Sequence, residues 1–350
     1  MSALGPRAAR ARGRSAALAA LAALALVLVC APRPAAAQLT ELQLARRQGA
    51  GWWARFKGSA AQLSTYLGSG TLLTGEHGDN PYVGQDLLLL PRLNLTGAQS
   101  VRLLWGAGCE YTPADNGASG RRCSPSDLRL SYHHIGLWRD PWIGGRLTGS
   151  AQLWLPVSYE SRANHTLFNL RGAAGYLVRV ARERLELRYD LAVQKYLPTR
   201  RARGYGGARS DGDGVALCLA RAGRGDAAAC GSGGPLNDNV LVINSLHVAW
   251  FFRDRLWLSA DVLLYNYFRF AVTDDPLTPP GLPRGGRADQ SWGTLELAYQ
   301  LQPHLVLALG SSSRQPALHA DGRWPRFPFW DFVSPANNFS QLYVAATAIY

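Results

Sequence analysis

The sequence predicts an all-β fold: a closed antiparallel transmembrane β-barrel of about twelve strands, with short turns at one end and long loops at the other. Three observations lead to this expectation. Apolar and polar side chains alternate along many stretches, as they do in a strand whose two faces meet different surroundings. No apolar run after residue 38 reaches the roughly 20 residues that a spanning helix requires. The links between the stretches are of two very different lengths.

The start of the chain predicts a secretory signal that is cleaved after Ala37. Arginines without acidic neighbours precede the apolar stretch 16–31, and three alanines stand just before the cleavage point, which is the order of a signal peptide. The apolar stretch is shorter than a spanning helix. Anchoring through Cys30 as a lipoprotein is disfavoured, because the residue before such a cysteine should be small and Val29 stands there.

The charge balance does not point to a nucleic-acid partner. The chain has 37 Lys and Arg against 24 Asp and Glu, and five of the arginines precede residue 38. The expected mature chain therefore carries 32 basic against 24 acidic residues, a net charge of +8. Its arginines are scattered mostly singly through strand-like segments, with no recognition helix, so we expect no nucleic-acid surface.

The alternation is clearest in the segment 146–159. One face of this segment carries Leu147, Gly149, Ala151, Leu153, Leu155, Val157 and Tyr159. The other face carries Arg146, Thr148, Ser150, Gln152, Trp154 and Ser158. Segments 185–194 and 101–110 repeat the pattern. A soluble sandwich also alternates, so the link lengths have to decide between the two folds.

The links fall into two classes of length. Very short links occur at 97–100, 181–184, 253–255 and 302–304, and a slightly longer one at 139–144. Long polar links occur near 69–82, 112–126, 198–238, 271–288 and 314–338. The link 160–164 departs from the pattern, because it is short where a long one is expected. Tight turns at one rim and long loops at the other are typical of membrane barrels.

The segments between these links predict twelve strands. They lie near 56–68, 83–96, 101–111, 127–138, 145–159, 165–180, 185–197, 239–252, 256–270, 289–301, 305–313 and 339–350. An even number of strands puts the beginning of the first strand and the end of the last one on the short-turn side.

In this architecture the chain resembles bacterial outer-membrane β-barrel proteins of the porin type. The last segment adds to the resemblance, because an apolar face that ends on Tyr350 is similar to the β-signal read by the barrel insertion machinery. The resemblance implies a location in the bacterial outer membrane, with periplasmic short turns and extracellular long loops. It also implies outer-membrane lipid and the insertion machinery as partners. The oligomeric state stays open.

The resemblance divides the chain into three parts. Residues 1–37 are the signal peptide, residues 38–55 are a periplasmic lead-in or an internal plug, and residues 56–350 form the barrel. Aromatic side chains are expected in girdles at the two membrane interfaces. Near the short turns these are Trp138, Trp142, Trp250, Phe251 and Phe252. Towards the other rim they are Tyr111, Tyr159, Tyr196, Tyr265 and Tyr267.

Four cysteines remain after the signal and allow three disulfide connectivities. The local pairs Cys109–Cys123 and Cys218–Cys230 are the simplest, because each would close one polar stretch. An exported compartment permits such disulfides. A metal site is disfavoured, since no pair has the spacing of a zinc site and no histidine lies beside them.

The polar faces of the strands predict a lumen with charges of both signs. The lumen-facing candidates are Arg92, Arg102, Glu110, Arg129, His133, Arg146, Gln152, Arg171, Arg179, Glu186, Arg188, Asp190, Asp261 and Glu296. Antiparallel register around the turn 181–184 places Arg179 near Glu186. Such charges form either a structural ion-pair network or a slightly positive wall that favours small polar, anionic or zwitterionic solutes.

The search for chemistry gives little. Ser131 and His133 share one strand face and are a remote candidate for a hydrolase, but no nucleophile motif surrounds them and no carboxylate is evident to orient the histidine. The stretch 211–214 offers oxygens but lacks the further carboxylates of a calcium loop. No cofactor and no metal are expected. Three functions therefore remain: a narrow passive channel or transporter, then a non-conducting structural or surface-interaction barrel, then an outer-membrane hydrolase.

Overall fold

The structure is a computed structural model that describes residues 52–72, 82–112, 122–158, 161–162, 165–199, 237–270, 286–318, 325–331 and 340–350. The expected signal peptide, most of the segment 38–55, the pair Cys218/Cys230 and the stretch 211–214 lie outside these residues. No helix among the described residues is long and apolar enough to cross a membrane.

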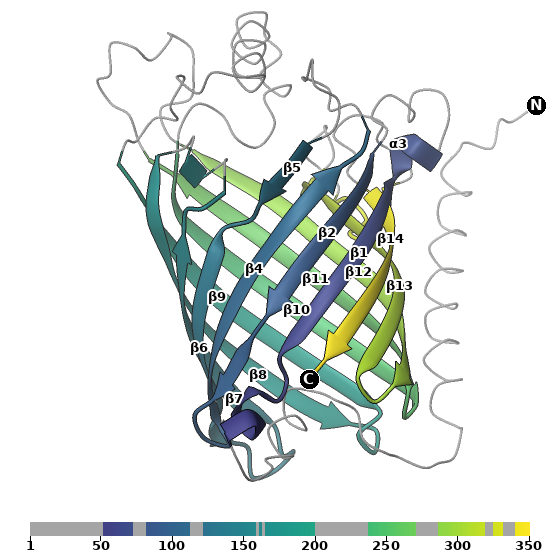
Figure 1. The fold of residues 1–350 in the computed structure, drawn as a ribbon. Helices are drawn as coiled ribbons and strands as arrows, with labels where there is room; N and C mark the ends of the chain where they lie inside the picture. Colours follow the sequence, from purple (N-terminus) through teal and green to yellow (C-terminus); the bar gives the residue numbers. More distant parts are fainter. Residues whose placement is uncertain are drawn as a thin grey trace, which may run out of the picture. The chain divides into compact units, whose positions relative to one another are not determined.

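All strands belong to one sheet that closes on itself (Figure 1). Consecutive strands pair antiparallel around the ring, β14 pairs with β1, and the additional pairing of β2 with β4 completes the circle. The elements are the 3-10 helix η1 (Trp52–Phe56), β1 (Ala60–Gly68), α3 (Ser69–Leu72), β2 (Val83–Leu90), β3 (Arg92–Asn94), β4 (Gln99–Glu110), β5 (Arg122–Pro125), β6 (Leu128–Arg139), β7 (Arg146–Leu155), β8 (Thr166–Val180), β9 (Leu185–Pro198), β10 (Asp238–Arg253), β11 (Leu256–Arg269), β12 (Arg287–Gln302), β13 (Leu305–Pro316) and β14 (Ser340–Ile349).

Two of these labels mark interruptions rather than additional strands. Strands β2 and β3 both pair with β4 and are separated only by Pro91, whose missing N–H removes one hydrogen bond of the ladder. Strands β5 and β6 also pair with β4, one after the other. The ring therefore has twelve strands, as predicted, and the alternation of short and long links is confirmed.

The predicted bounds need four corrections. The predicted strand 145–159 is too long, because β7 ends at Leu155. Residues 56–59 precede the first strand, because Phe56 ends η1. Residues 122–125 were predicted to lie in a long loop, but they form β5. This strand pairs with the end of β4 that β6 does not reach. Strand β13 continues to Pro316, so residues 314–316 belong to the wall of the barrel and not to the loop.

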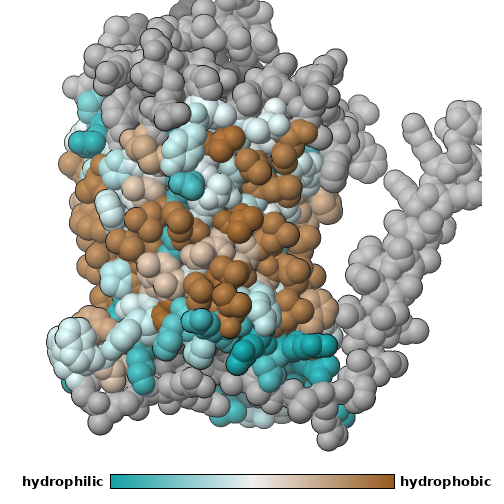
Figure 2. All heavy atoms as spheres, turned by 45° about the vertical axis from the view of Figure 1, so that its right-hand side comes forward, coloured by the Kyte–Doolittle hydropathy of each residue, from teal (hydrophilic) through white to brown (hydrophobic). Residues whose placement is uncertain are grey.

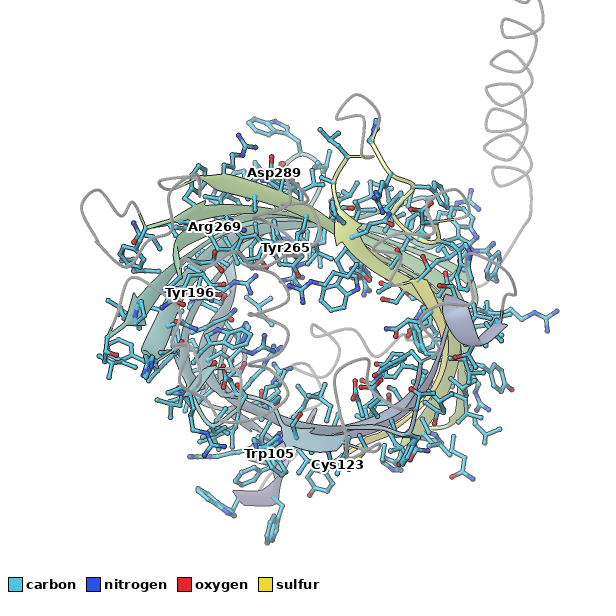
Figure 3. All side chains as sticks on the ribbon, turned by 90° about the horizontal axis from the view of Figure 1, so that it is seen from above. Trp105, Cys123, Tyr196, Tyr265, Arg269 and Asp289 are labelled. Carbon is cyan, nitrogen blue, oxygen red and sulfur yellow. A yellow bond between two sulfur atoms is a disulfide. The ribbon has the colours of Figure 1, made fainter. Side chains whose placement is uncertain are left out.

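The two faces of the sheet meet different surroundings. Tyr196 and Tyr265 point into the barrel (Figure 3), and the strand registers place every second residue on their side. The opposite face carries exposed leucines and valines such as Leu309, which is 58% exposed. These residues form an apolar belt around the barrel (Figure 2). A belt of this kind covers the hydrocarbon-facing wall of a membrane barrel.

The expected aromatic girdles are only partly right. Trp138, Trp142 and Phe252 are exposed near the short turns, and Tyr111 is exposed near the long loops. By contrast, the register places Phe251, Tyr196, Tyr265 and Tyr267 on the inner face. The error arose because period-two alternation separates two faces but does not say which face a mixed aromatic segment presents to lipid.

The barrel closes where its first and last strands meet. Nine residue pairs join β1 to β14, from Ala60 opposite Ile349 to Gly68 opposite Gln341. Beyond the ladder, the N–H of Tyr350 donates to the carbonyl of Ser59 at 2.9 Å, and the N–H of Gly58 donates to the carbonyl of Tyr350 at 2.6 Å. No strand edge is left open along this line, which hydrocarbon would not tolerate.

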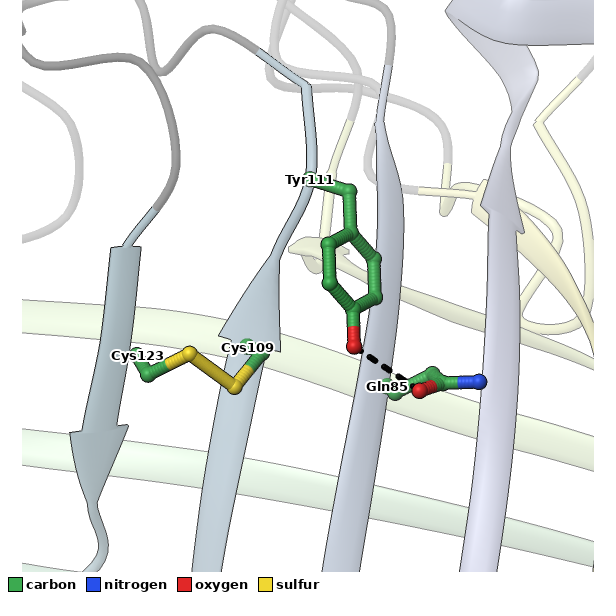
Figure 4. The surroundings of a disulfide bond; sticks show 4 residues. All are labelled: Gln85, Cys109, Tyr111 and Cys123. Carbon is green, nitrogen blue, oxygen red and sulfur yellow. Dashed lines mark hydrogen bonds between the residues drawn. A yellow bond between two sulfur atoms is a disulfide. The ribbon is translucent and has the colours of Figure 1, made fainter.

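Cys109 and Cys123 form a disulfide between the paired strands β4 and β5 (Figure 4). The register places Cys109 on the outer face, where the hydroxyl of the nearby Tyr111 donates to the side chain of Gln85 at 2.8 Å. The bond closes the long link between β4 and β5. The first of the two expected cysteine pairs is therefore present.

We expect a charge to be tolerated on the inner face but not on the outer one. Leu309→Arg would put a guanidinium in the apolar belt and should destabilise the barrel by about 2–4 kcal/mol. The matched variant Thr294→Arg lies on the inner face, within reach of Asp261, and should cost clearly less. Urea unfolding in lipid vesicles measures both. Equal costs would contradict the assignment of the faces.

Candidate functional site in the barrel interior

The register places all the lumen candidates on the face that carries Tyr196 and Tyr265. Rows of cross-strand neighbours connect them, for example Arg102 to Ser131, Gln152 to Arg171, and Asp261 to Thr294. The same face carries polar and aromatic residues that the sequence did not single out. They are Asp86, His247, Arg269, Gln290, Trp292 and Arg314, together with Tyr66 and Tyr343.

Two ion pairs lie on the wall formed by β8 and β9, in the half of the interior towards the short turns. Arg179 and Glu186 approach to 2.8 Å, at the neighbouring positions that the register of the turn requires. Arg188 pairs with Asp190 on the same strand at 2.7 Å. Both pairs belong to β8 and β9, so much of the charge on this wall is neutralised within the protein.

A second polar network lies on the neighbouring wall. His247 Nδ1 and Asp261 Oδ1 are 2.7 Å apart across β10 and β11. The hydroxyl of Thr294 donates to the other oxygen of Asp261 at 3.3 Å. Glu296 lies on β12 like Thr294, and it accepts a hydrogen bond from the hydroxyl of Tyr343 on β14 at 2.9 Å. This network carries more carboxylates than cations, in contrast to the arginines described next.

Arg129 and Arg171 face the lumen in the half nearer the long loops. Arg129 lies over the ring of Trp154, with its guanidinium carbon 5.1 Å from the ring centroid. Arg171 lies on β8 opposite Gln152, one inward position away from the row that joins Arg129, Trp154 and Asn169. The Nε atoms of both have no hydrogen-bond partner among the described residues. A guanidinium offers donors in a planar fork that suits carboxylates and phosphates, so this wall is able to bind anions.

A tyrosine cluster adjoins the arginines around Arg314. Its guanidinium donates to the hydroxyl of Tyr267 and to Gln290, both at 3.2 Å, and lies 5.8 Å from the ring centroid of Tyr265. Tyr265 and Tyr267 are stacked with centroids 6.1 Å apart. The upper wall thus combines guanidinium, amide and hydroxyl groups with flat aromatic faces. Arg314 was not among the predicted lumen residues, because residues 314–338 were predicted to be a loop, whereas β13 continues to Pro316.

Two cavities open inside the barrel. One has a volume of about 310 Å³ and extends between Gln62 on β1 and Glu186 on β9, which lie half-way around the ring from each other. The other has a volume of about 150 Å³ and includes Arg171, His133 and Arg188 in its lining. The side chains of the described residues therefore leave room in the interior.

Ser131 and His133 are in contact, since His133 Nε2 lies 3.0 Å from Ser131 Oγ. Ser131 is only 4% exposed, and its hydroxyl also donates to the carbonyl of Arg102 at 3.3 Å. Among the residues that the structure describes, no group of three or more His, Cys, Asp or Glu side chains is arranged to hold a metal ion.

No protein-family model and no curated protein matches the sequence. Solved structures do resemble the fold. An outer-membrane channel from Pseudomonas putida F1 has a TM-score of 0.51 at 12% identity, with 84% of this chain and 96% of that chain covered. The NanC porin has a TM-score of 0.41 at 8% identity, with 83% and 99% covered. Outer membrane phospholipase A from Escherichia coli has a TM-score of 0.34 at 10% identity, with 85% and 97% covered.

The fold and its surface define the class of protein. A closed twelve-stranded barrel, an apolar outer belt and a polar interior form a porin-like outer-membrane β-barrel. The chain therefore resides in the bacterial outer membrane, with its short turns on the periplasmic side and its long loops outside.

We expect Glu186→Gln to destabilise the barrel. The amide keeps the shape of the side chain but leaves Arg179 without its carboxylate, at a site where Glu186 is 8% exposed. Glu186 lines a cavity with room for water, which would reduce the penalty of a buried unpaired charge, so a loss of about 1–3 kcal/mol is expected. Urea unfolding measures it.

The control is Asp289→Asn on the outer rim. Arg287 and Asp289 approach to 2.7 Å but are 58% and 38% exposed, so this substitution should change stability by about 1 kcal/mol or less. If both variants lose the same amount, the interior pair does not differ from a surface pair.

Proposed function

We propose that the chain is a narrow passive channel for small polar or anionic solutes. The observation that carries the proposal is the pair of lumen-facing arginines, Arg129 and Arg171, whose Nε atoms have no hydrogen-bond partner among the described residues. Arg171 also lines an interior cavity. A structural ion-pair network would neutralise such groups, as it does for Arg179 and Glu186. The Nε atoms themselves are buried, so a solute would meet the positive charge of the two guanidiniums rather than these donors.

The number of strands supports a narrow passage. Barrels of about 8 strands are filled by side chains and barrels of 16–18 strands leave open channels, so twelve strands lie between these cases. The lumen candidates named above are proposed to line the path. The wall that carries Arg129 and Arg171 is positive, whereas the region near Asp261 and Glu296 is negative. This distribution of charge would favour anions and would still admit zwitterions.

Other parts of the proposal concern export and assembly. Residues 1–37 are proposed to be a signal peptide that is removed on export, and residues 38–55 a periplasmic lead-in or a plug. Tyr350 is proposed to end the signal that the barrel insertion machinery reads. Its exposure of 56% on the outer face leaves it accessible at that edge of the barrel.

We expect the purified protein to form discrete conducting steps in planar lipid bilayers, with a preference for anions in a salt gradient. Arg129→Glu combined with Arg171→Glu should lower the ratio of anion to cation permeability several-fold, because it reverses the charge of the wall. The control Arg287→Glu changes a side chain on the outer face and should leave the ratio unchanged. Absence of any conductance would favour a non-conducting structural barrel instead.

The contact between Ser131 and His133 is the specific observation that favours a hydrolase as the second candidate. The depth of Ser131 argues against it, because a nucleophile has to reach its substrate. We expect no esterase or phospholipase activity towards short-chain esters or phospholipid micelles, and hence no change in Ser131→Ala. An activity that Ser131→Ala abolishes in a folded barrel would contradict the channel as the main function.

A further inference from the structure

The outer face of β12, β13 and β14 is polar at the end nearer the long loops. Gly293, Ser313, Gln315 and Ser340 point outwards there, in register with one another across the three strands. Nearer the short turns the same outward positions are apolar and exposed, as at Leu309. The polar positions are instead buried, with Ser313 at 0% and Gln315 at 2% exposure. Something other than the strands therefore forms the surface here.

A short segment, residues 325–331, covers these positions, and we call it the strap. Gln315 donates from Nε2 to the carbonyl of Phe327 at 2.7 Å, and the hydroxyl of Ser340 accepts the N–H of Asp331 at 2.9 Å. Gly293 lies directly beneath Pro328, where an added Cβ would come within 2.2 Å of the proline carbonyl oxygen. The absence of a side chain at Gly293 thus lets the strap lie flat on the barrel.

A buried ion pair and hydrogen bonds to residues 317 and 318 hold the strap in place. Arg326 and Asp331 form an ion pair at 3.3 Å, with side chains 5% and 3% exposed. The N–H of Arg326 donates to the carbonyl of Ala317 at 3.1 Å, and its Nε donates to the carbonyl of Leu318 at 3.3 Å. The polar groups of the strap thus turn towards the barrel.

The surface that the strap presents outwards is apolar. Phe327 is 58% exposed and packs edge-on against Phe329, with ring centroids 5.4 Å apart. Leu318, bridged to Pro325, is 45% exposed beside them. Strand neighbours nearer the short turns, such as Leu295 and Val344, are exposed members of the apolar belt, so the strap continues that belt towards the long loops.

We propose that the strap is a lipid-binding surface of the barrel wall, and that Phe327 and Phe329 lie in outer-leaflet lipid at the boundary of its hydrocarbon. The inner and outer faces of the strap would then have different roles. Its inner face accepts a hydrogen bond from Gln315 Nε2 and donates one to the hydroxyl of Ser340, which itself bonds to Ser313. It thereby covers polar groups that would otherwise face hydrocarbon. Its outer face supplies the aromatic residues that membrane proteins place at the interface.

Photo-crosslinking in vesicles tests this proposal without any assumption about conduction. A benzoylphenylalanine replaces Phe327, and the full chain is refolded at low protein density into phosphatidylcholine vesicles. Illumination should give covalent lipid adducts, detected by mass spectrometry. The same group at Leu309, in the apolar belt, should give lipid adducts as a positive control. At Tyr265, which points into the barrel, it should give almost none.

Each outcome bears on the proposal. Lipid adducts at Phe327 with a yield similar to that at Leu309 support it. Adducts at Leu309 but none at Phe327 would overturn it, and so would crosslinks from Phe327 to a second copy of the chain. If the Phe327 variant fails to form the barrel, the same group at the exposed Leu318 probes the same surface with the same expected result.

Discussion

Every backbone N–H and C=O group in the spanning strands has to find its partner inside the protein, because hydrocarbon offers none. Closure of the sheet through the pairing of β1 with β14 and of β2 with β4 satisfies this constraint. The other features follow from it. A closed ring of strands has an inside and an outside, and each strand must present alternate residues to each. The apolar belt and the charged lumen are the two products of that alternation.

The constraint also explains where the chain departs from regularity. Pro91 stands between the end of β2 and the start of β3 and interrupts their hydrogen-bond ladder with β4, because proline has no backbone N–H to donate. Gln315 on β13 and Ser340 on β14 are polar residues on the outer face that would meet lipid, and the strap covers them and bonds to both. The polar interior is under less restriction, since neighbouring side chains can pair with its charges, as Glu186 does with Arg179, and its cavities leave room for water or solute. It is therefore the part of the barrel that is free to acquire a function.

Much of the fold was predictable from the sequence, because period-two alternation and link length are local signals. They gave twelve strands and most of the strand bounds. The parts that failed depend on contacts between distant residues. Strand β5 was missed because its only support is β4, and the inward direction of Tyr265 is decided by the register with its neighbours.

The candidate site was predictable to the same degree and for the same reason. The pairing of Arg179 with Glu186 follows from the tight turn between them, so the sequence alone was sufficient. The pairing of His247 with Asp261 is also across a short turn, but His247 lies in a nearly continuous apolar run that conceals its face. The inward position of Arg314 depends on where β13 ends and the long link begins. The contact of the strap with the barrel depends on what that link folds against. Neither is encoded in local periodicity.

The central claim is that one face of each strand meets water in a lumen while the other meets lipid. Single cysteines placed at consecutive positions along β12, from Gly293 to Leu297, test this most directly in vesicles treated with a water-soluble, membrane-impermeant maleimide. The account predicts labelling at residues 294 and 296 and protection at residues 295 and 297. Uniform labelling, or uniform protection, would contradict it.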